Sequence, residues 1–104
     1  MKVLPEPVVF DWDKGNINKN FEKHKVSDKE SEEVFERQKK FIFEDQKHSL
    51  VETRYMIWGE TNKKRKLTIF FTMRNKQVRI ISARDMSHKE RRVYEKKIQI
   101  DTKV

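Results

Sequence analysis

Large apolar side chains occupy every second position along residues 67–73 of this chain. The apolar positions are Leu67, Ile69, Phe71 and Met73, and the positions between them are Thr68, Phe70 and Thr72. Successive side chains of a β-strand point to opposite faces, so this repeat of two predicts a strand with one strongly apolar face.

Four other segments have the composition of strands. Residues 54–58 alternate in the same way, and residues 77–83 carry apolar side chains on both faces, which is typical of an interior strand. Residues 41–45 and 8–12 are shorter candidates. A basic hairpin loop over residues 59–66 and a tight turn at Arg74-Asn75-Lys76 separate the three strongest strands, since Asn tolerates a left-handed backbone.

The first helix is predicted over residues 14–24. Asp13 stands at its N-cap position, and Ile17 and Phe21, four residues apart, share one face that we expect to pack in the core.

Two capping boxes predict the other helices. Ser27 with Glu30 opens a second helix, whose Val34 and Phe35 should face the core. Ser87, with Glu90 three residues later, opens a final helix that should run to about residue 97.

The predicted order is β-α-α-β-β-β-β-α. This order is typical of an α+β domain with a small, twisted, mostly antiparallel sheet and helices on one side. The opposite side of the sheet is then available as a concave platform. We expect one domain over residues 1–97 and a C-terminal tail over residues 98–104, which could include a short strand.

The composition excludes several classes of protein. Of the 104 residues, 35% are hydrophobic and 40% are charged, yet seven Phe, two Trp and the alternating runs favour a folded domain over disorder. There is no Cys, and His24, His48 and His88 lie too far apart for a recognised metal spacing, so we expect no metal and no cofactor. No apolar run resembles a signal peptide or approaches a membrane span, so we expect a cytoplasmic protein without membrane contact.

The positive charge is concentrated in the second half of the chain. Residues 1–60 hold 11 Lys and Arg against 13 Asp and Glu, whereas residues 61–97 hold 13 against 3. The net charge of +8 therefore comes wholly from the second half, which indicates nucleic acid or an acidic partner. A lysine-rich surface that serves only solubility is the alternative.

Three segments carry a resemblance to a known family. The first comprises Phe10-Asp11-Trp12-Asp13, Asn20, Lys23-His24 and Val26-Ser27. The second comprises Glu52, Arg54-Tyr55 and Gly59, and the third comprises Arg79-Ile80-Ile81-Ser82-Ala83-Arg84 with Glu90-Arg91 and Tyr94. Together they resemble the BrnT family, the toxin half of bacterial type II toxin–antitoxin pairs.

The resemblance implies a fold similar to that of RelE-type ribonucleases. It also implies metal-independent cleavage of RNA, dependent on the ribosome or not, which inhibits translation. The implied partner is a BrnA-like antitoxin, DNA-binding and ribbon-helix-helix-like, that forms a hetero-oligomer with the toxin. Two positions depart from the family pattern: Lys25 stands where Gly is usual, and Asn16 where Lys is frequent.

Three arginines are the main candidates for catalysis. Arg79, Arg84 and Arg54 could stabilise the charge of the phosphorane that forms when a 2′-oxygen attacks the adjacent phosphorus. Alternatively they pair with carboxylates of this chain or of the antitoxin. Residues 79 and 84 differ by an odd number, so a regular strand would point them to opposite faces.

The remaining catalytic candidates each have a structural alternative. His24 could act as acid or base near neutral pH, or end the first helix. Tyr94 could donate a proton or stack on a base, or belong to the core. Glu52 could accept the 2′-proton or orient Arg54.

Several cations are candidates for binding the RNA backbone. They are Lys63, Lys64, Arg65 and Lys66 of the basic loop, and Lys89 and Arg91 of the final helix. Besides a ribonuclease toxin, the sequence is compatible with a non-catalytic RNA- or ribosome-binding module, or with a structural subunit whose basic face docks an acidic protein.

Overall fold

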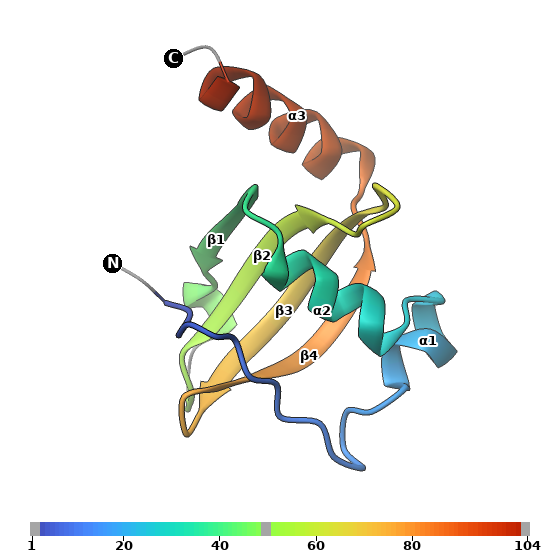
Figure 1. The fold of residues 1–104 in the computed structure, drawn as a ribbon, viewed down its shortest axis with the longest axis vertical. Helices are drawn as coiled ribbons and strands as arrows, with labels where there is room; N and C mark the ends of the chain where they lie inside the picture. Colours follow the sequence, from blue (N-terminus) through green and yellow to red (C-terminus); the bar gives the residue numbers. More distant parts are fainter. Residues whose placement is uncertain (1–2, 49–50, 103–104) are drawn as a thin grey trace.

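The computed structural model describes residues 3–48 and 51–102. Its elements are α1 (Lys19–His24), α2 (Asp28–Glu36), β1 (Lys40–Glu44), a 3-10 turn η1 (Gln46–His48), β2 (Arg54–Glu60), β3 (Lys66–Arg74), β4 (Gln77–Asp85) and α3 (His88–Thr102). The strands form one antiparallel sheet in the order β1-β2-β3-β4 (Figure 1). The α+β class predicted from the sequence is confirmed.

The alternating residues of β3 form the centre of the core. Leu67, Ile69 and Phe71 have no exposed surface and pack in one cluster with Val34 and Phe35 of α2. Burial of each such side chain stabilises the fold by about 1.5–3 kcal/mol. The helix α2 therefore covers one face of the sheet, as Figure 1 shows.

The capping box that opens α2 is confirmed. Ser27 Oγ accepts a hydrogen bond from the Glu30 backbone N–H at 3.1 Å, and Glu30 Oε1 accepts one from the Ser27 N–H at 2.9 Å. Two otherwise unpaired backbone groups are satisfied, which begins the helix at this point of the chain.

The predicted first strand over residues 8–12 is wrong. The segment makes only one isolated parallel bridge, Phe10 with Val78, held by two backbone hydrogen bonds of 2.8 Å. The chain then enters a hydrogen-bonded turn at Asp13, which ends the pairing before a ladder can form. The segment still lies along the outer edge of β4.

The first helix is shorter than predicted, and Asp13 is not its cap. Its carboxylate accepts from the Gly15 N–H at 2.7 Å within a turn, and α1 begins only after Asn18, whose backbone is left-handed with φ of 59°. The helix ends at Lys25, also left-handed with φ of 57°. This is the conformation that Gly adopts readily, and Lys adopts it at a cost of roughly 1 kcal/mol.

The predicted core positions of the first helix are also wrong. Ile17 and Phe21 are 47% and 49% exposed, because the turn before α1 directs a different set of side chains toward the sheet. Asn20 faces β4 instead, and its Oδ1 accepts from the Ala83 N–H at 2.9 Å.

The two hairpins that flank β3 differ in their turns. Asn75 and Lys76 both have positive φ, 52° and 64°, so the predicted tight turn is a two-residue turn with a left-handed backbone at both positions. The basic loop is shorter than predicted, because β2 extends to Glu60 and β3 begins at Lys66.

A β-bulge in β4 determines which way its arginines point. Ile80 lies opposite Phe71 and Ser82 opposite Phe70, so Ile81 is an extra residue without a partner on β3. One extra residue reverses the alternation of side chains beyond it. Residues 79 and 84 therefore point to the same face of the sheet, contrary to the expectation for a regular strand.

The final helix is longer than predicted and packs on the sheet face opposite α2, whereas the sequence predicted helices on one side only. Residues 98–102, expected in a tail, continue α3 to Thr102, and residues 103–104 lie outside the described residues. Tyr94 of α3 packs with Trp58, whose side chain points away from α2. Only part of the sheet is thus covered on this side. No helix of the described chain has the length and apolar character needed to cross a membrane.

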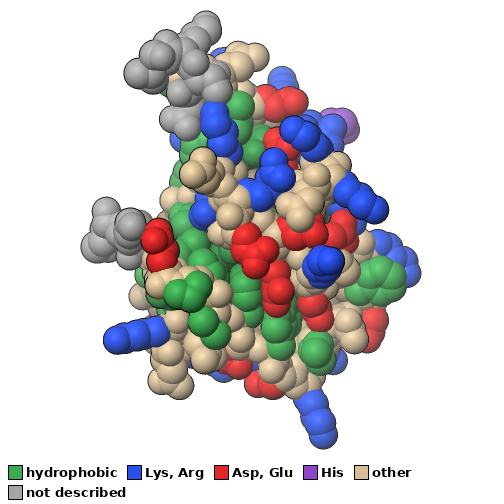
Figure 2. Space-filling model, in the orientation of Figure 1, with side chains coloured by type: hydrophobic (Ala, Val, Ile, Leu, Met, Phe, Trp, Pro, Cys, Tyr) green, Lys and Arg blue, Asp and Glu red, His purple; other side chains and the backbone are tan. Residues whose placement is uncertain are grey.

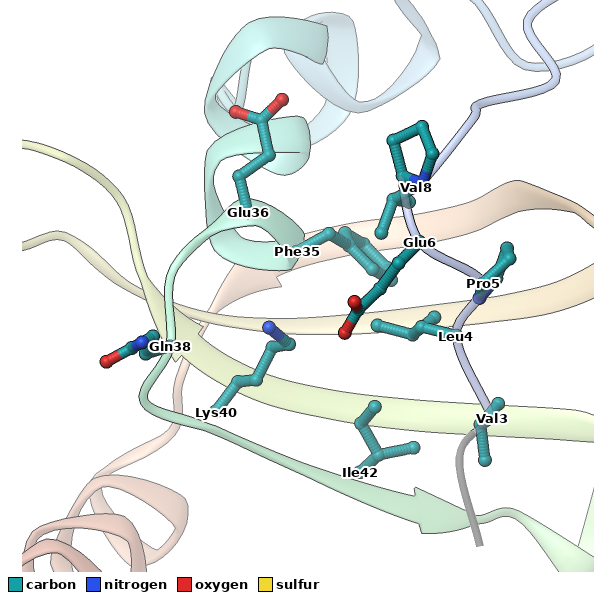
Figure 3. Close-up of a pocket in the computed structure, with 11 residues that line it drawn as sticks. Val3, Leu4, Pro5, Glu6, Val8, Phe35, Glu36, Gln38, Lys40 and Ile42 are labelled. Carbon is teal, nitrogen blue, oxygen red and sulfur yellow. The ribbon is translucent and has the colours of Figure 1, made fainter.

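A pocket of about 600 Å³ lies between the N-terminal segment and the edge strand β1 (Figure 3). Leu4, Phe35 and Ile42 line its apolar part, and Glu6 and Lys40 extend toward each other across it. Burial lowers the pKa of Lys40, against the attraction of Glu6. The pocket is on the α2 side and therefore lies away from the arginines of the sheet.

We expect Gly59→Ala to lower the free energy of unfolding by about 1–3 kcal/mol. A Cβ at Gly59 would lie 2.8 Å from Cγ1 of Val34, so α2 could not keep its position on β2. Urea denaturation measures the effect. In the double variant with Val34→Ala the two losses should not add, because the second change removes the clash. Additive losses, or a stable single variant, would contradict this packing.

Candidate nucleic-acid interface

The sheet surface opposite α2, which we call the arginine face, gathers the three candidate arginines. Arg54 of β2 lies opposite Thr72 of β3, and Thr72 lies opposite Arg79 of β4. Arg84 lies opposite Thr68, four residues from Thr72 on the same strand. Cross-strand partners point to the same side of a sheet, so β2 and β4 place these three guanidinium groups on one surface.

Phe70 lies between two of these arginines and was not singled out from the sequence. Its ring centroid is 5.7 Å from Cζ of Arg54 and 5.9 Å from Cζ of Arg84. A guanidinium near an aromatic ring is attracted by the ring quadrupole, by about 0.5–1 kcal/mol at partly exposed sites. The alternation of residues 67–73 did indicate this position, because it set Phe70 on the polar side of the strand.

Arg84 is held by Glu90 at the start of α3. Its Nη1 donates to Oε1 at 2.7 Å and its Nη2 to Oε2 at 3.0 Å, while Thr68 Oγ1 and the Ser87 N–H also donate to Oε1. Burial alone would raise the pKa of Glu90, but the hydrogen bonds from Arg84, Ser87 and Thr68 outweigh it and lower this pKa to about 2. Arg84 is therefore paired with a carboxylate of this chain, and its catalytic role stays a prediction.

Arg79 forms ion pairs with two aspartates of the N-terminal segment and is less exposed than Arg65, Arg74 or Arg84. Its Nη2 lies 3.0 Å from Oδ1 of Asp13 and its Nη1 3.5 Å from Oδ2 of Asp11, and the side chain is 14% exposed. The hydrogen bond from Arg79 lowers the pKa of Asp13. A Cβ at Gly15 would lie 2.8 Å from Nη2, so the absence of a side chain there makes room for the guanidinium.

Glu52 forms a two-point ion pair with Arg74. The distances are 2.9 Å from Nε to Oε2 and 3.0 Å from Nη2 to Oε1. The hydrogen bond from Arg74 lowers the pKa of Glu52, so the carboxylate is ionised at neutral pH. Both side chains are exposed, at the end of the sheet where β2 begins and β3 ends.

His24 and Tyr94 lie away from Arg79. His24 is exposed at the end of α1, and its carbonyl accepts from Arg65 near Asp85, at the far end of β4. Six strand residues, roughly 20 Å, separate that end from Arg79. Tyr94 is 1% exposed, and burial raises the pKa of its hydroxyl, which donates to Glu60 at 3.2 Å. The structure thus places Tyr94 in the core.

The cations of the predicted basic loop differ in exposure and in contacts. Lys63 and Lys64 are exposed, and Lys66 is half-buried at the start of β3. Arg65 instead ties the loop to the body of the protein: its Nε donates to Asp85 at 2.7 Å and its Nη1 to the Lys25 carbonyl at 2.7 Å.

Arg65 also lies 3.3 Å from Glu30, at the start of α2. Its hydrogen bonds with Asp85 and Glu30 raise the pKa of its guanidinium, which is held in place by the fold rather than presented to solvent. The remaining predicted cations, Lys89 and Arg91, are exposed on α3. The basic candidates therefore lie over α3 and the loop.

The face that carries α2 is rich in acidic side chains. The helix contains five acidic residues and one lysine, and Figure 2 shows acidic side chains over its centre with basic ones around the margin. Asn16, where the family pattern frequently has Lys, is buried and donates to carbonyls of Asp11 and Ile80. Among the described residues, no group of three or more His, Cys, Asp or Glu side chains could hold a metal ion.

A family model for the ribonuclease toxin BrnT of type II toxin–antitoxin systems matches residues 12–90. The matched span contains the whole sheet and ends at Glu90, so it includes the arginine face and the carboxylate that holds Arg84. No curated protein matches the chain.

We expect Glu90→Gln to lower the free energy of unfolding at pH 7 by about 2 kcal/mol, because charge-assisted hydrogen bonds are lost. A carboxylate whose pKa falls on folding stabilises the protein above its ordinary pKa of 4.5, and this contribution is lost as pH falls toward 2. Urea denaturation should therefore show a smaller decrease in the free energy of unfolding between pH 7 and pH 3 for the variant than for the parent.

Glu95→Gln is the matched control, since Glu95 is exposed on the same helix. It should unfold like the parent at both pH values. Equal acid sensitivity of the Glu90 variant and the parent would contradict the role given to the Arg84–Glu90 pair.

Proposed function

The chain belongs to the BrnT family of ribonuclease toxins of type II toxin–antitoxin systems, and on this basis we propose that the arginine face binds and cleaves RNA. The observation that carries the proposal is that Arg54, Arg79 and Arg84 share one face of the sheet, with Arg54 and Arg84 on either side of Phe70. We propose that cleavage requires no metal and inhibits translation in the cytoplasm until an antitoxin binds.

Arg54 and Arg84 are the proposed ligands of the reacting phosphate. A guanidinium presents two N–H donors side by side, which matches two phosphate oxygens. Both groups lie within 6 Å of the Phe70 ring, which limits how far they can move. Donors that are already oriented stabilise developing negative charge without reorganisation in the transition state.

The proposed reaction is attack of a 2′-oxygen on the adjacent phosphorus, with departure of the 5′-oxygen. Glu52 is the proposed acceptor of the 2′-proton, because it is an exposed carboxylate two residues before Arg54. Its lowered pKa makes it a weak base, so most of the rate enhancement must come from the arginines.

Arg79 is proposed as a positioning residue. With a side chain only 14% exposed and two aspartates beside it, it holds residues 11–13 against β4. In this proposal the guanidinium remains paired with the aspartates and does not contact the phosphate.

A non-catalytic RNA-binding module is the second candidate. One observation favours it: Arg84 already donates two hydrogen bonds to Glu90, so a phosphate must compete with a carboxylate for this group. Such a module would bind RNA on the same face without cleaving it.

The proposed partner is a BrnA-like, DNA-binding antitoxin with a ribbon-helix-helix fold. The family supports a toxin–antitoxin pair, and the basic charge of residues 61–97 suits a partner with acidic segments. The antitoxin and RNA would compete for this basic part of the surface.

We expect the purified chain to cleave single-stranded RNA in the presence of EDTA, and Arg54→Ala and Arg84→Ala to slow cleavage about 10²–10³-fold. Loss of one oriented guanidinium removes charge stabilisation from the transition state. Cleavage rates on a labelled RNA measure this, and induced expression of the parent without antitoxin should arrest growth.

Arg37→Ala is the control, because Arg37 ends α2 on the other side of the sheet. It should cleave like the parent. Folding of each variant is checked by circular dichroism, and Arg54→Lys gives a second variant that keeps the charge. A soluble parent that binds RNA without cleaving it would establish the second candidate function instead.

We expect RNA affinity to fall with salt in proportion to the phosphates contacted. Three contacts on a single strand give a slope of about −2 in a plot of log K against log salt, a loss of roughly 20-fold between 50 and 200 mM. Filter binding to a labelled oligonucleotide measures the slope, which Arg54→Ala should reduce by about 0.7. An unchanged slope in this variant would place the phosphate contacts elsewhere.

A further inference from the structure

The helix α3 contacts the sheet along one side only. Tyr94 is buried against Trp58, and Nζ of Lys97 lies 5.5 and 5.4 Å from the ring centroids of Phe41 and Phe43. Figure 1 shows the rest of the helix projecting past the end of the sheet. Its other side therefore has no neighbour among the described residues.

That outer side carries a basic and apolar stripe, formed by Lys89, Arg92, Val93, Lys96 and Ile100. Their spacing of three, four or seven residues places them on one helical face. Four of them line a shallow depression of about 440 Å³. Val93 is 41% exposed and Ile100 is 70% exposed, so two large apolar side chains of the stripe face solvent.

We propose that the outer stripe of α3 is the docking site for an acidic amphipathic helix of the antitoxin. This inference rests on the proposed function and adds the place where its inhibitor binds. The three cations complement carboxylates of the partner, and the two aliphatic side chains fit the apolar stripe of a second helix laid alongside. The stripe contains no acidic residue that would repel such a partner.

The two aliphatic side chains of the stripe favour a protein over RNA as its binding partner. Proteins that bind single-stranded RNA use cations to contact the phosphates and aromatic side chains on which the bases stack. Val93 and Ile100 offer no such platform, and their exposed surface is stabilised only by apolar contact. The stripe therefore suits a partner helix better than a nucleotide chain.

Docking at this site would also affect the arginine face. Glu90, in the first turn of α3, accepts two hydrogen bonds from Arg84, so the base of the helix and a proposed phosphate ligand are joined directly. Lys89 of the stripe directly precedes Glu90, so a helix that reaches the start of the stripe would approach this pair. It could exclude RNA from Arg84 without filling the rest of the sheet.

Three variants of the full chain test the proposal, with the antitoxin encoded beside the toxin as the probe. The charge variant is Lys89→Glu with Arg92→Glu and Lys96→Glu, and the apolar variant is Val93→Ser with Ile100→Ser. We expect association about 10–100-fold slower for the first and dissociation about 10-fold faster for the second, measured by surface plasmon resonance.

The control variant reverses the same charge at Lys14, Lys19 and Lys23, which are exposed in and before α1. It should keep parental association and dissociation rates. Circular dichroism shows whether each variant keeps its helices, and RNA affinity is measured on all of them with a labelled oligonucleotide.

Parental antitoxin binding by both α3 variants would overturn the proposal. Equal decreases in the association rate for the charge variant and the α1 control would also overturn it, because they would show long-range electrostatic attraction rather than docking on α3. Loss of RNA affinity with antitoxin binding intact would assign the stripe to RNA instead. A parent that binds antitoxin through α3 but does not cleave RNA would refute the proposed ribonuclease activity alone.

Discussion

One extra residue in β4, Ile81, determines which side chains share the arginine face. Without the bulge, Arg79 and Arg84 would point to opposite sides, and one of them would enter the core beneath α2. With it, both stand on the surface that also carries Arg54 and Phe70. Two fully buried faces would have required a larger apolar inventory than this chain has, so the sheet leaves one face partly open to solvent.

Ion pairs hold the arginines in place, but phosphate must then compete with the paired carboxylates for the guanidinium groups. Arg79 is held by aspartates of the N-terminal segment, and Arg84 is held by Glu90. A paired guanidinium keeps its orientation, which favours a transition state that needs charge at a fixed place. The same pairing keeps carboxylates next to the site, and they repel an incoming RNA chain. Arg54 and Arg84, which flank Phe70, therefore carry most of the proposed phosphate contact.

The two faces of the molecule differ in the charged side chains that they carry. Acidic side chains of α2 cover the core side, as Figure 2 shows, while Arg54, Arg79 and Arg84 lie on the arginine face and exposed cations lie along α3. Such separation steers a polyanion to one surface and leaves the other unattractive to it. The helix α3 lies at the boundary, since its inner side packs on the sheet and its outer side faces solvent. In the proposed function, RNA and an acidic inhibitor would therefore bind to adjacent parts of the same surface.

The sequence by itself determined the elements whose signals are local. The alternation of residues 67–73 and the Ser27–Glu30 capping box depend on neighbours within a few positions, and both are confirmed. The tertiary structure alone decided that Phe21 is exposed and that Phe70 lies between Arg54 and Arg84. These features depend on strand pairing and on a bulge that join residues far apart in the chain. No local pattern encodes such pairings, because they arise only when the whole sheet forms.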